Sequence, residues 1–543
     1  MGDYAEYTVQ ERKPAQKRMA TQTLPKAQLV TTGSEPYHAP ESTAPAWLWV
    51  LPLVGAILTP GLWWTTADWP FAFRPDLIGT MTLFVGIAAT TVLAVLSSGF
   101  RWRIRWSLGV TTAVVIAGFQ WRMFTIAGES VAEATGISLI ADVIPILLAG
   151  ALLWLTVRLA QDWQFALITG VAMMVAVTWM ALANIALVAP APGPLSIEHA
   201  EPGSPDVVLV VLDGYARADW LEDEYGFDNR SFLEGLESRG FAIASAATPN
   251  YGYTYASVST MLNLDYVFTT GEVSDDERHK MRAALTGATG LIPLFKEAGY
   301  EITYLENAWG GSQCGSVVDW CVRDGLTERS LWNLGQMTIL APILRTIRPD
   351  PFNSVSEAQL ESLGGVLAAP HEEGKPRFTF AHVLMPHTPL LLDAECNRHG
   401  QDELRRWGAE EGELLAARRL NYVEQTRCVN SKVLDAIDSL LSANPDALVM
   451  ITGDHGPGST LDVNLPLDQL PEATIQERMK TLGAYRLPGC SSSVRKSLTP
   501  VNGTRILTNC ALGTNLAPLS DLNRWADLDG EGYVTDITSR LIN

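Results

Sequence analysis

The sequence predicts two structural parts: a bundle of five transmembrane helices, then an α/β domain with a mostly parallel central sheet. Five long apolar runs follow one another before residue 189. In the rest of the chain, short apolar segments that end in acidic residues alternate with segments of helical periodicity. This alternation is typical of βαβ units, whose parallel strands are buried on both faces.

The N-terminal part divides into a tail and a membrane domain. Residues 1–45 are polar and carry Pro, Thr and Ser among mixed charges, which predicts a disordered tail. Each of the five apolar runs is near the ~20 residues that cross a bilayer, and tryptophans lie near their ends, where interfacial aromatic residues belong. Asp142 in the fourth run is costly unless it is satisfied inside the bundle or the span begins later. The runs are 46–65, 77–99, 106–124, 137–157 and 164–188.

Loop charges predict the orientation of the spans. Arg101, Arg103 and Arg105 crowd the second loop, and Arg158 lies in the fourth. The positive-inside rule therefore places these loops and the tail in the cytoplasm. Because the number of spans is odd, we expect everything after residue 189 to lie outside the membrane.

The cysteines indicate the same compartment. All six follow the apolar runs, and an even set in an exported domain predicts disulfides formed in an oxidising environment. Pairing by nearest neighbour predicts Cys314–Cys321, Cys396–Cys428 and Cys490–Cys510. The net charge of −20 argues against nucleic acid as a partner.

The exported domain begins after a Pro-rich linker. Residues 189–205 form this linker, which we expect to be extended, and residues 206–543 form the domain. The domain opens with an apolar strand, Asp206–Leu212, followed by Asp213. A carboxylate at the end of such a strand is costly unless it is paired or bound to a metal. Asp213 is therefore either a metal ligand or the N-cap of a helix.

The next segments carry a candidate nucleophile. Residues 228–240 predict a helix, and residues 241–246 predict a short strand. The apolar spacing that follows Thr254 places this residue at a helix N-terminus. Thr254 is either an N-cap or a nucleophile that points at the strand ends, where the helix N-terminus favours a bound anion.

Two later segments carry candidate substrate contacts. A strand at 300–306 leads into a loop with Trp309 and Arg323, which either hold a phosphate and a polyol or pack the core of the loop. Residues 377–389 predict a strand that ends in a loop with His382 and His387. Prolines stiffen this loop, which suits a positioned imidazole at His387, although a histidine is more often structural.

The last motif lies at the end of another buried strand. A helix at 421–441 precedes the apolar segment 447–451, which leads to Asp454, His455 and Gly456. Ligands bind at the carboxyl ends of strands in open α/β sheets, and adjacent Asp and His offer an oxygen and an imidazole to a divalent metal. The alternative is a turn with a solvated histidine. The residues from Glu477 onward predict a closing strand and helices.

Together these residues predict phosphoryl chemistry. Asp213, Asp454 and His455 are metal ligands by type, and Thr254 supplies a hydroxyl. A divalent cation would lower the pKa of that hydroxyl and neutralise charge on a phosphoryl or sulfuryl group. The chemistry that fits is displacement through a covalent phospho-threonine, with His387 binding the oxyanion or protonating the leaving oxygen.

The order of motifs resembles a known group. Leu-Asp-Gly, Asn-Tyr-x-x-Thr, His-x(4)-His-x-Pro and Asp-His-Gly resemble the sulfatase-like branch of the alkaline phosphatase superfamily. Five spans followed by an exported domain resemble the membrane-anchored lipoteichoic acid synthases and lipid A phosphoethanolamine transferases. The resemblance implies one divalent ion (Mn, Mg or Zn), Thr254 as the nucleophile, His387 at the substrate and His382 as a weaker substrate or outer-shell candidate. The metal ligands that it implies are Asp213, Thr254, Asp454 and His455.

The sequence departs from these families at three points. They usually carry Glu where this chain has Asp213, so the metal can differ. No histidine follows His455, which argues against a two-zinc phosphodiesterase site. The Cys/Ser-x-Pro-x-Arg motif of a formylglycine sulfatase is absent from the sequence.

Three hypotheses follow. The first is a membrane-anchored phosphotransferase that moves a lipid head group, phosphoglycerol or phosphoethanolamine, from a membrane phospholipid to an envelope glycan or lipid. The second is an extracytoplasmic phosphodiesterase or sulfatase-like hydrolase that uses water as acceptor. The third is a non-catalytic envelope-binding protein that keeps the fold.

Overall fold

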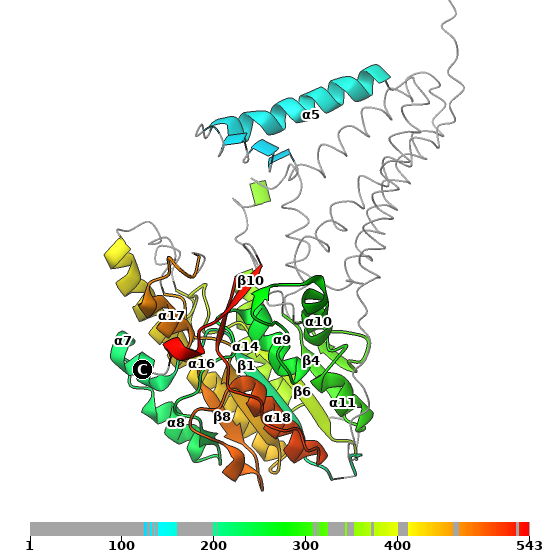
Figure 1. Cartoon of the computed structure of the whole chain (residues 1–543), viewed down its shortest axis with the longest axis vertical. Coiled ribbons are helices and arrows are strands. Elements are labelled where there is room, and N and C mark those ends of the chain that lie inside the picture. The colour runs from blue at the N-terminus through cyan, green and yellow to red at the C-terminus, as the bar shows by residue number, and fades with distance from the viewer. Residues whose placement is uncertain are drawn as a thin grey trace, which may run out of the picture. The chain divides into compact units, whose positions relative to one another are not determined.

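The computed structural model describes most of the chain after residue 202 and one long helix before it (Figure 1). The described residues are 124–125, 127–128, 131–132, 135, 139–159, 199–201, 203–307, 312, 314–323, 343–344, 352–370, 374–399, 411–459, 466–527 and 532–541. Trp309 and most of the predicted transmembrane residues lie outside them.

A seven-stranded sheet organises the described part of the C-terminal domain. Its strand order is β2-β8-β7-β1-β6-β4-β5. The five strands from β7 to β5 are mutually parallel, whereas β8 pairs antiparallel with both of its neighbours. The strands are β1 (Val207–Leu212), β2 (Ala242–Ile243), β4 (Glu301–Leu305), β5 (Trp320–Val322), β6 (Arg377–Val383), β7 (Leu448–Gly453) and β8 (Gly483–Arg486).

Sequence explains why the middle strands are central. Every residue of β1, β6 and β7 is buried, as expected for strands covered on both faces. The predicted strands that precede Asp213 and Asp454 are thus confirmed. His382, expected in the loop after its strand, lies inside β6 instead, in register with Val211 of β1. The apolar pattern continues beyond the histidine and keeps it within the ladder.

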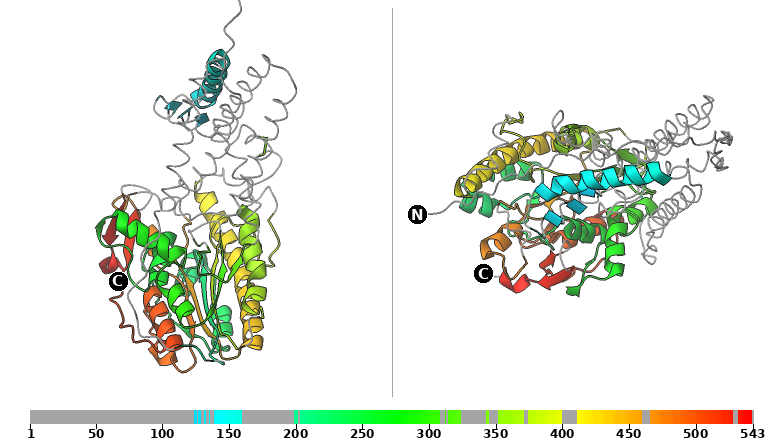
Figure 2. Two further views of the ribbon diagram at one scale, coloured as in Figure 1. Left: turned by 90° about the vertical axis from the view of Figure 1, so that its right-hand side faces the viewer. Right: turned by 90° about the horizontal axis from the view of Figure 1, so that it is seen from above.

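Helices cover the two faces of the sheet. Alternate residues of β1 belong to two separate cores, one packed against α9, α10, α11 and α18, the other against α7, α8, α14 and α16. Figure 2 shows the sheet between these two layers. The helices are α7 (Ala218–Tyr225), α8 (Arg230–Glu237), α9 (Thr254–Asn263), α10 (Asp275–Leu285), α11 (Leu291–Glu297), α14 (Phe352–Leu367), α16 (Glu411–Ala443) and α18 (Pro500–Leu512).

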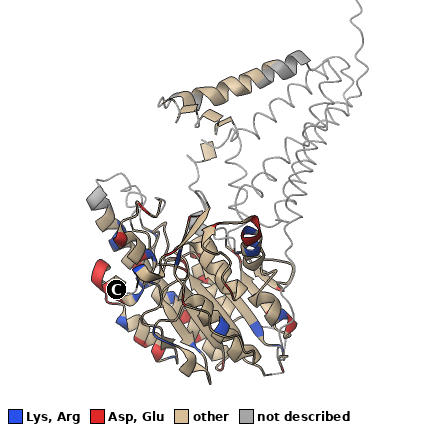
Figure 3. Cartoon of the chain, in the orientation of Figure 1, with Lys and Arg blue, Asp and Glu red and all other residues tan. Residues whose placement is uncertain are grey.

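Charged side chains are distributed according to the same arrangement of a central sheet between helices. Lys, Arg, Asp and Glu lie mostly on the outer helices and loops, and the strands of the sheet are mostly free of them (Figure 3). Helix α10 begins with a capping box, in which Ser274 and Glu277 satisfy each other's backbone N–H groups. The helix predicted at 421–441 is confirmed and is longer than expected, because α16 already begins at Glu411.

A small second sheet and a short helix complete the fold. Strands β3 (Gly271–Glu272), β9 (Arg524–Asp527) and β10 (Tyr533–Asp536) pair antiparallel in the order β3-β10-β9. Helix α17 (Glu472–Arg478) packs through Ile475 against Trp525 of β9. This contact brings the end of α17 close to the loop that precedes α9, because the ring of Trp525 also lies against Gly252.

The three predicted disulfides are confirmed. Cys314–Cys321, Cys396–Cys428 and Cys490–Cys510 are bonded, and no cysteine is left unpaired in the chain, whose six cysteines are all described. The Cys396–Cys428 bridge ties the loop after β6 to α16. Such a set is typical of an oxidising compartment.

The fourth apolar run forms a helix, α5 (Leu139–Leu159), with Pro145 inside it. Among the helices that the structure describes, none has both the length and the apolar composition needed to cross a membrane. The other four predicted spans lie outside the described residues, apart from Phe124 at the end of the third.

Candidate active site

The candidate site lies at the carboxyl ends of three adjacent parallel strands. Asp213 follows β1, and Asp454 and His455 follow β7, whose Gly453 is in register with Leu212. On the other side of β1, His382 occupies the end of β6. Because β1 pairs with both neighbours, residues far apart in sequence meet at one edge of the sheet.

Helix α9 brings Thr254 to the same edge. Thr254 is the first residue of the helix, and the N-cap is Tyr253, which makes no side-chain capping bond. The Thr254 Oγ1 lies 2.9 Å from His455 Nε2. His455 Nδ1 is 2.8 Å from the Gly456 carbonyl oxygen and therefore carries the proton. Nε2 is thus an acceptor, and the Thr254 hydroxyl donates to it.

Two buried carboxylates face this pair. Asp454 Oδ1 accepts hydrogen bonds from the backbone N–H groups of Gly214 and His455, at 3.0 and 2.9 Å. Its Oδ2 is 3.2 Å from His455 Nε2, and Asp213 Oδ1 is 3.7 Å from the same nitrogen. Within the described residues, Asp454 Oδ2 and both oxygens of Asp213 are buried and have no hydrogen-bond partner.

His387 reaches the site from the loop after β6. Its backbone N–H donates to the Asp213 carbonyl at 2.9 Å, and its ring centroid lies 5.9 Å from that of His455. Nδ1 is 2.7 Å from the Thr388 carbonyl oxygen, which leaves Nε2 for substrate. Gly214 permits this approach: it has φ +68°, and a Cβ there would stand 3.3 Å from the His387 ring.

One side chain of α16 holds the His387 loop in place. Gln425 Nε2 donates to the carbonyls of Pro386 and His387, both at 3.1 Å, and its Oε1 accepts from Leu391 N–H at 2.7 Å. From the same turn of the helix, the Tyr422 hydroxyl donates to the Gly214 carbonyl at 2.7 Å. Helix α16 thus positions both the His387 loop and the turn after Asp213.

Burial and neighbouring charges set the protonation of the site. Burial and the negative charge of Asp213 raise the pKa of Asp454 to about 6. Burial acts in the same direction on Asp213, but the imidazoles of His387 and His382 outweigh it and hold the pKa of Asp213 well below its usual range. Burial and the charge of Arg478 lower the pKa of His455 well below its usual value, so His455 is neutral.

Arg478 is a site residue that the sequence did not single out. It ends α17, and it is buried. Its Nε and Nη2 donate to the Gly252 carbonyl at 3.0 and 2.7 Å, and its Nη1 donates to the Gly456 carbonyl at 3.3 Å. The guanidinium therefore joins the loop before Thr254 to the residue after His455. Its neighbours Glu477 and Lys480 are charged as well, so the local sequence carries no signal that marks it.

The donor atoms fit a divalent cation. Within each of two residue sets, Asp213 with His387 and His455, and Asp213 with His382 and Asp454, one ligand atom from every residue lies within 4.8 Å of the others. Buried carboxylates without a counter-charge cost free energy, and a divalent ion removes that cost. Carboxylate oxygen and imidazole nitrogen are common ligands of such ions.

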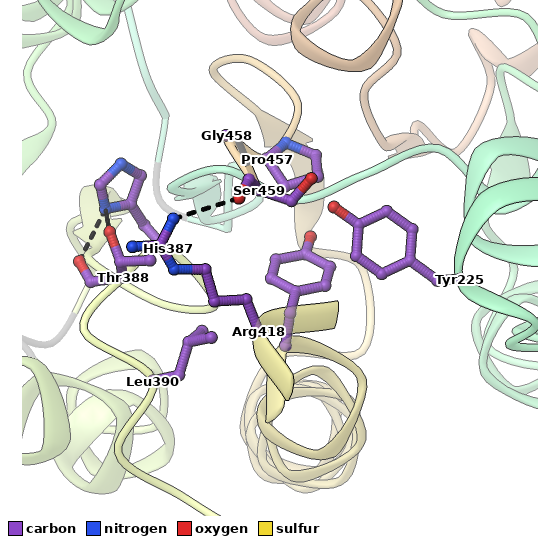
Figure 4. Close-up of a pocket in the computed structure, with 9 residues that line it drawn as sticks. Tyr225, His387, Thr388, Leu390, Arg418, Pro457, Gly458 and Ser459 are labelled. Atoms are coloured by element: carbon purple, nitrogen blue, oxygen red, sulfur yellow. Dashed lines mark hydrogen bonds between the residues drawn. The ribbon is translucent and has the colours of Figure 1, made fainter. Parts of the chain in front are cut away.

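A pocket opens beside His387 (Figure 4). Its walls include the rings of Tyr225 and Tyr422, whose centroids are 5.2 Å apart. Arg418 extends along it and donates to the Ser459 carbonyl at 3.3 Å. The hydroxyl of Tyr225 binds Glu477, so the pocket presents mainly carbon to a ligand.

The structure brings six of the predicted site residues together and places one elsewhere. Arg323, predicted to bind substrate, donates through Nε to Glu306 Oε2 at 3.0 Å, next to the Cys314–Cys321 disulfide. Both sulfurs there are oxidised, so this cluster offers no thiolate. The role of Arg323 stays a prediction, and Trp309 lies outside the described residues. The six that meet are Asp213, Thr254, His382, His387, Asp454 and His455.

Comparison with protein families identifies the domain. The Sulfatase family model matches residues 205–488, more than half of the 543-residue chain. The chain belongs to the sulfatase family. As a sulfatase-family protein it is an enzyme of the alkaline phosphatase superfamily, and the α/β domain with its mostly parallel sheet is the sulfatase-like fold. The predicted family resemblance is therefore confirmed.

Solved structures similar to this sulfatase-family chain include three structures of two bacterial proteins. One is the C-terminal periplasmic domain of EcEptC from Escherichia coli in complex with Zn, at 13% identity and a TM-score of 0.41, covering 64% of this chain and 96% of that chain. The soluble domain of lipooligosaccharide phosphoethanolamine transferase A from Neisseria meningitidis has 16% identity and a TM-score of 0.38, covering 59% and 92%. The integral membrane protein of the same name has 14% identity and a TM-score of 0.39, covering 86% and 96%.

TM-scores below 0.5 add no argument for substrate or mechanism. Comparison with the curated proteins by sequence found no match.

Proposed function

We propose that the chain is a membrane-anchored, divalent-metal-dependent phosphotransferase that moves a phospholipid-derived head group, phosphoglycerol or phosphoethanolamine, to a cell-envelope acceptor. The observation that carries this proposal is the Thr254 hydroxyl, 2.9 Å from the neutral His455 and beside two buried carboxylates. A threonine in this position supports phosphoryl transfer, because a formylglycine sulfatase requires Cys or Ser.

In this proposal Thr254 Oγ1 gives up its proton to solvent and attacks phosphorus of the donor phosphodiester. The bond from phosphorus to the diacylglycerol oxygen breaks, and the head group remains on threonine as a phosphodiester. His387, at the mouth of the site, protonates the departing oxygen. An acceptor hydroxyl then attacks the same phosphorus and gives its proton to His387. The bond from phosphorus to Thr254 breaks, and the threonine oxygen regains a proton from solvent.

Asp213, Asp454, His455 and Thr254 would hold the cation. When bound, a divalent cation supplies charge neutralisation at the phosphoryl oxygens and lowers the pKa of a nearby hydroxyl. The pocket beside His387 is where a head group or acceptor would lie, with its carbon chain on Tyr225 and Tyr422.

We place the reaction on the outer side of a membrane. In this arrangement residues 206–543 form the catalytic domain, which the linker 189–205 joins to the five-span region 46–188 and the cytoplasmic tail 1–45. The three disulfides support an oxidising compartment for the catalytic domain.

Labelled phospholipid tests the proposal. Purified full-length protein with Mn²⁺ or Zn²⁺ should release diacylglycerol and label the acceptor, and quenched samples should carry the head group on the peptide with Thr254. Thr254→Ala should lose at least about 1000-fold in rate, because the covalent route is closed. Free head group in place of labelled acceptor would identify the chain as a hydrolase, and an undiminished rate in Thr254→Ala would end the phospho-threonine mechanism.

A further inference from the structure

A buried histidine in the strand beside β1 has no role in the reaction described above. His382 lies within β6, in register with Val211, and is fully buried. Its Nε2 has no hydrogen-bond partner among the described residues. The nearest acidic oxygen, Asp213 Oδ2, is 3.5 Å away, and Asp454 completes a compact group of ligand atoms.

The surroundings of His382 fix the direction of its imidazole. Ser312 Oγ is 3.1 Å from Nδ1, and the Asn307 amide donates to the His382 carbonyl at 3.2 Å. Nε2 therefore points at the carboxylates. The 3.5 Å separation is longer than an N–H···O hydrogen bond, so a direct bond to Asp213 does not account for this orientation. A buried ring nitrogen without a partner destabilises the fold.

The spacing of the donors fits a shared ion. Bonds of about 2.0–2.2 Å place neighbouring ligand atoms of one cation roughly 2.9–3.5 Å apart in tetrahedral or octahedral geometry. His382 Nε2 is 3.5 Å from Asp213 Oδ2, and His455 Nε2 is 3.2 Å from Asp454 Oδ2. The two oxygens of Asp213 face different histidines: Oδ1 lies nearer His455 and Oδ2 lies nearer His382.

We propose that His382 is a direct ligand of the divalent cation through Nε2, together with Asp213 and Asp454. The inference rests on the proposed metal-dependent function. Ser312 is then the outer residue that orients the imidazole, as such partners do in other metal sites, and Asn307 holds the backbone at His382. With imidazoles from both β6 and the end of β7, the site selects a transition-metal dication such as Zn²⁺ over Mg²⁺, which prefers oxygen ligands.

X-ray absorption at the zinc edge tests the proposal on the full-length protein loaded with Zn²⁺. In His382→Gln the scattering from imidazole should fall by one ring relative to the wild type, and Zn²⁺ affinity by titration should fall at least about tenfold. Ser312→Ala is the matched control, because it removes an outer contact and leaves the number of imidazoles unchanged. Unchanged imidazole scattering in His382→Gln would overturn the assignment.

Two further measurements keep the test decisive. If His382→Gln does not fold by circular dichroism, anomalous scattering from wild-type crystals should place zinc within about 2.3 Å of His382 Nε2, and an ion more than about 3 Å away would refute direct ligation. Thr254→Ala separates the two proposals. Its loss of transfer tests the phospho-threonine route, whereas the coordination of His382 is read from the spectrum without any turnover.

Discussion

Arg478 offers the most direct test of how the site is assembled. Its guanidinium makes three hydrogen bonds to the carbonyls of Gly252 and Gly456. Arg478→Met removes all three: the Gly252 carbonyl, two residues before Thr254, loses both guanidinium donors, and the Gly456 carbonyl keeps only the His455 imidazole. Removing one partner from a buried charged network costs about 3–5 kcal/mol, so we expect the free energy of unfolding to fall by that amount.

Urea unfolding followed by circular dichroism measures this change, provided that the slope with denaturant is the same in both proteins. Arg495→Met is the matched control: Arg495 is half exposed and pairs with Asp521, and a surface ion pair of this kind contributes about 0–1 kcal/mol. Arg478→Lys keeps the charge but loses the planar set of N–H donors that bridges two carbonyls. Its free energy of unfolding should therefore lie between those of Arg478→Met and Arg495→Met. If Arg478→Met were no less stable than Arg495→Met, the hydrogen bonds of the guanidinium would not stabilise the site as the geometry indicates.

Three further predictions concern packing, pH and the disulfides. Gly456→Ala should destabilise the fold by at least about 1–3 kcal/mol, because the new Cβ would lie 1.9 Å from the Glu477 carbonyl oxygen; a melting curve matching the wild type would contradict this. The pKa of Asp454, raised to about 6, means that its proton competes with the cation below that pH, so cation affinity by titration should fall up to about tenfold per pH unit below 6. In the cation-free protein, the same raised pKa makes Asp454's contribution to stability greatest below pH 3.8 and lost as the pH rises through about 6. Cys396→Ser opens a bridge of sequence separation 32 and should cost about 3–4 kcal/mol; reductant should have little further effect on unfolding through this bridge, and an undiminished stability would refute the estimate.

The parts of the site that local sequence determines were predictable. Fully apolar runs before Asp213 and Asp454 admit few structures other than buried strands, and the spacing after Thr254 specifies a helix start. Cysteine order sufficed for the pairing because each disulfide joins neighbours along the chain.

The remaining contacts depend on tertiary structure. His382 reaches Asp213 only because β6 pairs with β1 in one register, and a shift by one residue would turn its ring to the opposite face. Arg478 acts on carbonyls more than 20 and more than 220 residues away, which no local pattern encodes. The roles of Trp309 and Arg323 depend on a loop that is only partly described.

The hydrogen bonds from Gln425 to the segment from Pro386 to Leu391 have a consequence for redesign. The backbone of this segment is held by an amide from a neighbouring helix, in addition to its prolines and its buried leucines. Thr388, which borders the pocket and belongs to neither core, can therefore be exchanged in a library while the backbone keeps its path. Such a library would vary which molecules the protein accepts and leave the side chains at the strand ends unchanged.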